Sequence, residues 1–155
     1  LRAFRGLPGR MEFVQKIRGV EFINDTTATN PTAAEHAVAA TKRRIDQHGL
    51  HVIAGGYDKG LPVGDFMSAL KRHAATVVFL PGTATRKMES KIKKGKSKIR
   101  TYDARTMAEA VQRAYRDAKR GDVVLLSPGA ASFEKFKNEF DRGEKFNTYW
   151  RKLST

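Results

Sequence analysis

The sequence predicts a Rossmann-like α/β/α domain of three layers, with a mostly parallel sheet and a short N-terminal hairpin. Short apolar segments, such as residues 50–56, 76–82 and 122–129, alternate with longer amphipathic segments. Each apolar segment stays almost continuously hydrophobic until it reaches Gly, Pro or Ser, and strands covered by helices on both faces show this pattern. The length of 155 residues fits one such domain with a single core.

The elements follow one another in order along the chain. Residues 11–17 and 20–24 flank Arg18 and Gly19 and predict the hairpin. A short polar strand is expected at residues 99–102, near an edge of the sheet. Apolar residues recur at helical spacing in three segments, which predict helices at residues 31–48, 62–74 and 106–122. Residues 83–94 are expected to form a basic helix. We expect a last helix to begin at Ser132.

The composition is strongly basic, with a formal net charge of +14 and no cysteine. This charge permits nucleic acid, an anionic membrane surface or anionic small molecules as partners. The densest basic segment, residues 86–100, contains eight Lys or Arg but no aromatic residue on which a base could stack. This favours a solvated surface and argues against nucleic acid, although a non-enzymatic polyanion-binding module stays an alternative.

The sequence also gives expectations about the cellular compartment of the protein. The absence of cysteine excludes disulfides and thiolate metal sites and fits a reducing cytoplasm. No apolar segment approaches the roughly 20 residues that span a bilayer, and no signal peptide is evident, so no membrane partner is expected. The chain begins with Leu1 rather than Met, which suggests a piece of a longer protein.

Three predicted strands end in polar or glycine-rich loops: "NDTTATN" (24–30), "GGYDKG" (55–60) and "SPGAAS" (127–132). Ligands of open α/β sheets bind beyond the carboxyl ends of the strands. Asn30 and Ser132 are candidate helix caps, and a helix N-terminus favours a carboxylate or phosphate. Small side chains would leave the backbone open to such a ligand.

Several motifs that activate phosphate or bind metal are absent. The sequence contains neither GxxxxGK[ST] nor GxGxxG. No two histidines stand at metal-binding spacing, so His36, His48, His51 and His73 are interpreted as structural or solvated, and no metal site is predicted. The loops therefore resemble half of an anion site without the groups that activate a phosphate.

Four segments together resemble the C-terminal domain of the Mur ligases: "FRGLPGRMEFV", "GVEFINDTTATNP", "GGYDKG" and "LLSPGAASFEKFKNEFDRGEKF". The resemblance covers residues 11–155 as the amino-acid-binding domain, with residues 1–10 as the remnant of an interdomain linker. Loop 24–30 is most similar to the branch of the family that adds D-glutamate. Another Mur ligase or a folylpolyglutamate-type enzyme is the alternative.

The resemblance implies a bacterial cytoplasmic ligase of peptidoglycan precursor synthesis. ATP would phosphorylate the carboxylate of UDP-N-acetylmuramoyl-L-alanine, and the amine of D-glutamate would attack the acyl phosphate. N-terminal and central domains of the same protein would hold the UDP-sugar, the phosphate loop and Mg²⁺. The 155 residues alone are therefore expected to be inactive.

The resemblance also implies roles for individual residues. Lys59 would pair with a carboxylate of D-glutamate, and Thr29 would donate a hydrogen bond to the same amino acid. Ser132 and Phe133, at the predicted helix start, would hold a D-glutamate carboxylate. A dicarboxylate needs such a cation and directed donors. Each residue also has a structural interpretation: Lys59 as a solvated lysine, Thr29 as a helix-start hydroxyl and Ser132 as a cap only.

For the nucleotide, the resemblance implies that Arg10 reaches an ATP phosphate and that Asp25 accepts from the ribose hydroxyls. Thr27 is also placed among the nucleotide-binding residues, but it replaces the lysine that is usual in the family. Gly9 replaces a histidine. Asp25 as a turn residue and Arg10 as a linker residue are the alternatives, and no general base is assigned. We interpret the aromatic series of the last helix as core packing: Phe133, Phe136, Phe140 and Phe146.

Overall fold

The computed structural model describes residues 7–154, so the first six residues of the predicted linker segment and Thr155 lie outside the described part. One sheet holds six strands, β1 (Glu12–Ile17), β2 (Val20–Asn24), β3 (Leu50–Ala54), β4 (Thr76–Phe79), β5 (Arg100–Asp103) and β6 (Val123–Leu126). Their order is β1-β2-β6-β3-β4-β5, and only β1 pairs in the antiparallel sense. The predicted hairpin, parallel sheet and edge position of the polar strand are confirmed.

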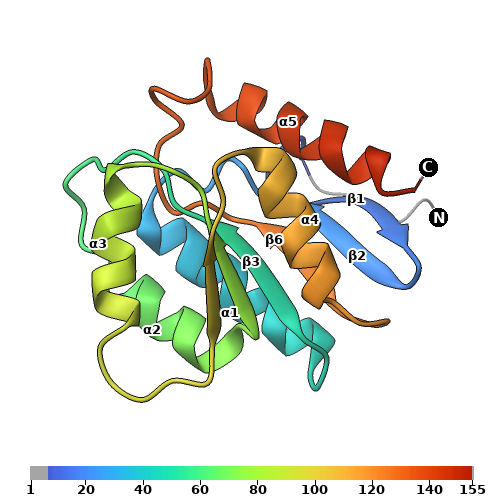
Figure 1. The fold of residues 1–155 in the computed structure, drawn as a ribbon, viewed down its shortest axis with the longest axis horizontal. Helices are drawn as coiled ribbons and strands as arrows, with labels where there is room; N and C mark the ends of the chain where they lie inside the picture. Colours follow the sequence, from blue (N-terminus) through green and yellow to red (C-terminus); the bar gives the residue numbers. More distant parts are fainter. Residues whose placement is uncertain (1–6, 155) are drawn as a thin grey trace.

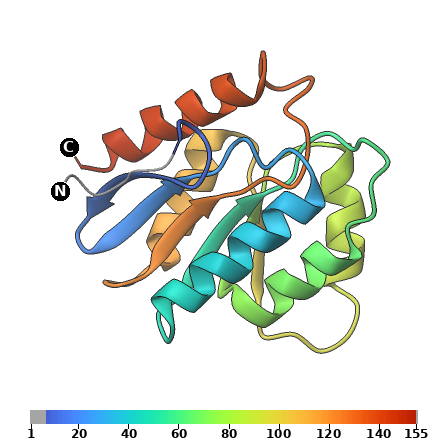
Figure 2. The ribbon, with the colours of Figure 1, turned by 180° about the vertical axis from the view of Figure 1, so that it is seen from behind.

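Helices cover both faces of the sheet (Figures 1 and 2). They are α1 (Pro31–Ile45), α2 (Gly64–His73), α3 (Thr83–Ile92), α4 (Met107–Asp117) and α5 (Glu139–Lys152). Successive strand side chains point to opposite faces. Val52 and Val77 therefore join the core under α1 to α3, whereas Ile53 and Val78 join the core under α4 and α5. This alternation produces the three predicted layers.

The last helix begins at Glu139, so the prediction that it begins at Ser132 is wrong. Residues 132–138 instead form turns, and Asn138 caps α5 by accepting from the Asp141 N–H. Glu134 has a φ of 73°, which a right-handed helix cannot contain. The core interpretation of the aromatic series is consequently wrong for Phe133 and Phe140, which are 56% and 55% exposed. It is confirmed for Phe146, and Phe136 is half-buried against the same core.

Helix α4 is shorter than the predicted segment 106–122 because the chain turns after Asp117 to enter β6. Asp122 lies in this turn and accepts from the Gly49 and Lys119 N–H groups and from His51 Nε2 at 2.9 Å. Burial acts to raise the pKa of Asp122, but these three hydrogen bonds outweigh it and lower the pKa below its usual value. The buried His51 thus has the structural role expected from the sequence.

Of the helices in the described part of the chain, none has both the length and the apolar character that crossing a bilayer requires.

Candidate functional site

The three polar strand exits lie side by side, because β2, β6 and β3 are adjacent and parallel. Backbone hydrogen bonds join the loops directly: Asp25 N donates to Leu126 O at 2.8 Å, and Gly129 N donates to Ala28 O at 2.9 Å. Asn30 caps α1 by accepting from the Ala33 N–H, as predicted. The predicted meeting of the three exits at one end of the sheet is confirmed.

The loops after β3 and β6 continue as a short antiparallel bridge. Tyr57 and Ala131 exchange two backbone hydrogen bonds, at 2.9 and 3.1 Å. Gly56 makes this approach feasible, because its φ is 148° and a Cβ there would lie 2.5 Å from Ala131 O. The bridge holds Lys59, two residues after Tyr57, next to the exit of β6.

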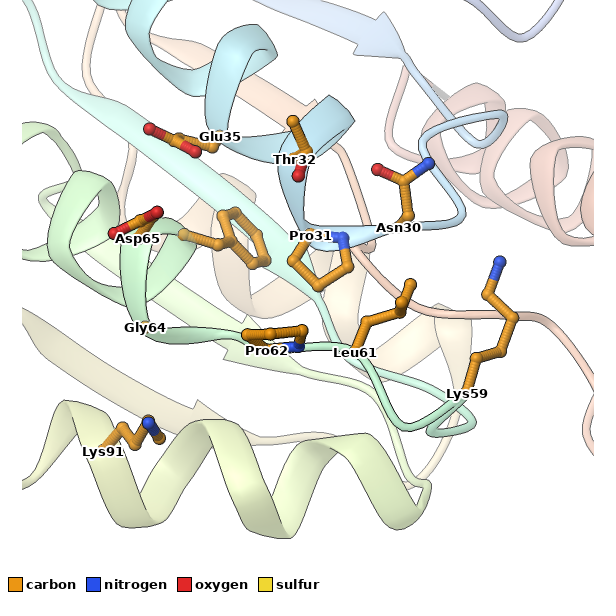
Figure 3. Close-up of a pocket in the computed structure, with 11 residues that line it drawn as sticks. Asn30, Pro31, Thr32, Glu35, Lys59, Leu61, Pro62, Gly64, Asp65 and Lys91 are labelled. Carbon is orange, nitrogen blue, oxygen red and sulfur yellow. The ribbon is translucent and has the colours of Figure 1, made fainter.

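Thr29, Asp58 and Lys59 line the same small cavity of about 10 Å³, which has room for roughly one water. An adjoining cavity of about 530 Å³ between α1 and α2 shares Lys59. Figure 3 shows Lys59 beside Asn30 at one end of this larger cavity. Within residues 7–154, neither the Lys59 ammonium nor the Thr29 hydroxyl has a side-chain partner. A cation and a hydroxyl donor at these strand exits therefore both lack an internal side-chain partner in the described part of the chain.

The other end of the larger cavity is acidic. Figure 3 shows Glu35 of α1 and Asp65 of α2 across from one another, far from Lys59 and with Lys91 of α3 on the third side. Neither carboxylate is paired with a cation in the described residues. A ligand carboxylate would therefore be attracted to the Lys59 end and repelled from the Glu35 and Asp65 end.

Ser132 and Phe133 lie at the same end of the sheet but not at a helix start, which corrects the geometry predicted for them. Ser132 is buried, and its carbonyl accepts from the Phe136 N–H in a single turn. The Phe133 ring packs edge-on against Tyr57, with 5.5 Å between ring centroids. Neither residue lines the cavity of Thr29 and Lys59, so their contact with a substrate stays a prediction.

Arg10, Asp25 and Thr27 share a second cavity of about 450 Å³, beside α1. Asp25 accepts from the Met11 N–H at 3.0 Å and from the Ser127 hydroxyl at 2.8 Å. Its carboxylate therefore ties Met11, just before β1, and Ser127, just after β6, to the exit of β2. Two of the roughly four acceptor positions of its carboxylate are used, which leaves acceptor capacity for a ligand.

Asp25 is also electrostatically unusual. Burial raises its pKa to about 6, although the hydrogen bonds from Ser127 and Met11 and the positive charge of Arg10 act to lower the pKa. A buried carboxylate that ionises near neutral pH is sensitive to a ligand that donates hydrogen bonds to it.

Gly9 and Thr27, the two positions at which the sequence resemblance is incomplete, contact each other. Both the N–H and the hydroxyl of Thr27 donate to Gly9 O, each at 2.9 Å. Gly9 has a φ of 72°, and a Cβ there would meet the methyl groups of Thr26 and Thr27 at 3.0 and 3.3 Å. A glycine at position 9 and a threonine at position 27 thus fit together as a pair.

Arg142, for which no role was predicted, is only 1% exposed. Its guanidinium donates to the Thr26 carbonyl at 2.8 Å, the Thr26 hydroxyl at 3.1 Å and the Ala130 carbonyl at 2.9 Å. It therefore holds the exits of β2 and β6 against α5. Gly143 allows α5 to approach, since a Cβ there would lie 2.7 Å from the Thr26 methyl. The "RG" of the last quoted segment was the available signal.

Comparisons with known proteins identify the family of this chain. Residues 9–130 match the family described as Mur ligase, glutamate ligase domain. A relative from Desulfitobacterium hafniense, named UDP-N-acetylmuramoylalanine--D-glutamate ligase, is 42% identical over 98% of this chain. A relative of the same name from Caldanaerobacter subterraneus is 37% identical over 94% of it. The chain spans only 32% and 31% of the lengths of these two relatives.

Solved structures share the fold at low sequence identity. UDP-N-acetylmuramate-alanine ligase from Thermotoga maritima matches 97% of this chain with a TM-score of 0.67 at 17% identity, and 31% of that protein is covered. Folylpolyglutamate synthase from Mycobacterium tuberculosis matches 93% with a TM-score of 0.66 at 15% identity, and 32% of that protein is covered. Because the family match covers most of the chain and the relatives are near 40% identical, this chain belongs to the Mur ligase family, as its glutamate ligase domain.

Proposed function

We propose that this chain is the amino-acid-binding domain of a bacterial cytoplasmic ligase that joins D-glutamate to UDP-N-acetylmuramoyl-L-alanine at the expense of ATP. The observation that supports it most is the shared cavity of Lys59 and Thr29, a cation and a hydroxyl donor without partners, at adjoining strand exits. The names of the relatives point to the same amino acid.

The proposed reaction has two steps. ATP transfers its terminal phosphoryl group to the carboxylate of the muramoyl-alanine substrate, which yields ADP and an acyl phosphate. The amine of D-glutamate then attacks the acyl carbon, an amide forms, phosphate leaves and the amine loses a proton. In this scheme Lys59 and Thr29 hold one carboxylate of D-glutamate. Glu35 and Asp65 repel carboxylates from the far end of the larger cavity and so restrict how the amino acid lies.

The nucleotide lies in the second cavity under this proposal, with Asp25 accepting from the ribose hydroxyls and Arg10 near a phosphate. Mg²⁺ would be held by other domains of the full-length protein, since no cluster of three or more metal-binding side chains occurs within residues 7–154. We expect these 155 residues alone to be inactive, because their sequence lacks a phosphate loop.

An amino-acid panel tests the assignment. The full-length protein, with ATP, Mg²⁺ and UDP-N-acetylmuramoyl-L-alanine, is expected to release phosphate with D-glutamate and not with L-glutamate, L-alanine, L-lysine or meso-diaminopimelate. Release of phosphate with a different amino acid only would assign the chain to another ligase of the family. A folate substrate that supports release in place of the muramoyl compound would assign it to the folylpolyglutamate type.

The pKa of Asp25 gives a pH prediction for nucleotide binding. Ribose hydroxyls donate to the ionised carboxylate, so ADP affinity of the full-length protein should fall as the pH drops through about 6. The Asp25→Asn variant should bind ADP more weakly at pH 8 and show a flatter pH profile, because ionisation at this position is removed. Titration calorimetry from pH 5 to pH 8, a range of about one to two units around that pKa, measures both. If ADP affinity depended on pH in the same way in both proteins, Asp25 would not be part of the nucleotide site.

A further inference from the structure

The positive charge of the chain is concentrated at the end of the sheet opposite the candidate site. The strands joined by α1 to α4 are parallel, so each of these helices returns against the strand direction and ends where the next strand begins. Figures 1 and 2 show the turn after α1 and the loop after α3 together along the lower edge of the molecule. The polar strand exits, which hold the cavities, lie at the other end.

We call this end the basic pole. It comprises the exposed or half-exposed cations of the helix ends, the following loops and the hairpin turn: Lys16, Arg18, Lys42, Arg43, Arg44, Lys71, Arg72, Lys93, Lys94, Lys96, Lys98, Arg100, Arg116, Lys119 and Arg120. Only four acidic residues accompany these fifteen cations: Glu21, Asp46, Asp117 and Asp122. The basic pole therefore carries a charge of +11, out of +14 for the whole chain.

Contacts join the parts of the basic pole into one surface. Lys71 of α2 donates to the carbonyls of Lys91 and Lys94 at 2.9 and 2.7 Å, which ties α2 to the end of α3. Gly121 N donates to Gly19 O at 2.9 Å, and Arg120 lies against Gly19, which ties the loop before β6 to the hairpin turn.

Two ordinary explanations do not account for this charge. One cation in the last turn is enough to complement the dipole of a helix, yet Lys93, Lys94, Lys96 and Lys98 lie beyond the end of α3. Electrostatic steering of anionic substrates would require the cations around the cavities, whereas they gather at the opposite end. Repulsion among so many like charges costs stability, so a partner that neutralises them is expected.

The chemistry of the basic pole favours a diffuse anionic surface over specific phosphate recognition. Helix C-termini present carbonyl groups, and the N–H groups that bind single phosphates lie at the other end of each helix. The exposed large hydrophobic side chains of residues 7–154 are Leu7, Leu61, Phe133 and Phe140. They lie before β1, in or next to the strand-exit loops, or at the start of α5. The basic pole therefore offers no such side chain for base stacking.

The shape of the basic pole indicates a planar partner. Its cations come from α1, α2 and the loop after α3 on one face of the sheet, and from the end of α4 on the other. They thus extend across all three layers, which suits a plane better than the narrow contact of a rod-like duplex. The four cations of residues 93–98 are all lysines, hydrated point charges that suit non-directional attraction.

We propose that the basic pole docks this domain on the surface of an anionic phospholipid bilayer, with the strand exits facing away from the lipid. The inference is independent of the ligase assignment. It replaces the expectation of no membrane partner, which was based only on the lack of a bilayer-spanning segment and a signal peptide. Docking in this orientation leaves the cavities at the strand exits open to substrates and to the rest of the protein while the domain is held at the membrane surface.

Vesicle co-sedimentation of the 155-residue chain tests the proposal. The chain should bind phosphatidylcholine vesicles that contain phosphatidylglycerol, should not bind pure phosphatidylcholine, and should be released by high salt. Changing Lys93, Lys94, Lys96 and Lys98 together to glutamine should weaken binding by at least about tenfold. The matched control removes the same charge outside the basic pole, through Arg86, Lys135, Lys137 and Lys145 to glutamine, and should weaken binding by less than about threefold.

All eight substituted side chains are exposed, so circular dichroism should show both variants folded. Absence of binding to the anionic vesicles at low salt would overturn the proposal. Equal losses in the two variants would overturn it as well, because binding would then follow net charge alone. Tighter binding to a duplex DNA than to the anionic vesicles at the same salt would assign the basic pole to nucleic acid instead.

Discussion

Replacing Arg142 by methionine is expected to lower the free energy of unfolding by about 3 kcal/mol, or roughly 6–12 °C in Tm. The substitution keeps much of the side-chain volume but removes three hydrogen bonds. The carbonyls of Thr26 and Ala130 would be left buried without this donor. Relief of the buried charge offsets part of the loss, since burial already lowers the pKa of Arg142 to about 10.

Lys145→Met is the matched control for Arg142→Met, because Lys145 is an exposed cation on the same helix α5. Its effect on the free energy of unfolding should stay within about 0.5 kcal/mol. Urea unfolding followed by circular dichroism measures both variants. If Arg142→Met were as stable as Lys145→Met, the guanidinium would not be what holds the exits of β2 and β6 to α5.

Replacing Lys59 by alanine in the full-length protein is expected to raise the KM for D-glutamate by roughly 10- to 150-fold. This range corresponds to the loss of one charge-assisted hydrogen bond, about 1.5–3 kcal/mol. Turnover should also fall, because an amino acid held by fewer contacts presents its amine less accurately. The KM for UDP-N-acetylmuramoyl-L-alanine should be unchanged, since the proposal assigns that substrate to other domains.

Lys91→Ala serves as the control for Lys59→Ala. Lys91 lines the same larger cavity, and its substitution removes the same charge as Lys59→Ala. Figure 3 shows Lys91 on α3, away from the Lys59 end. The KM for D-glutamate should change by less than about threefold in this variant. Comparable increases in the two variants would mean that the general charge of the cavity, and not a contact of Lys59, governs D-glutamate binding.

The fold and the meeting of the strand exits were predictable because both follow from patterns that are local in sequence. Continuous apolar segments mark the buried strands, and the parallel topology then brings the carboxyl ends of β2, β6 and β3 to one edge. Asn30 was predictable as a cap because Pro31 at the first helical position points to the same helix start.

The start of the last helix was not predictable in this way. Ser132 and Asn138 are both acceptable caps, and the choice between them depends on the positive φ of Glu134 and on where α5 docks. The role of Arg142 was not predictable for a related reason, because tertiary contacts bring its partners Thr26 and Ala130 to it. The sequence alone does not distinguish an arginine that will be buried among carbonyl groups from one that will be exposed to solvent.

The most direct test of the central proposal is a crystal structure of the full-length protein with bound D-glutamate. The proposal predicts one carboxylate of D-glutamate within about 3 Å of both the Lys59 ammonium and the Thr29 hydroxyl. A D-glutamate bound elsewhere, with both of these groups left in solvent, would contradict it.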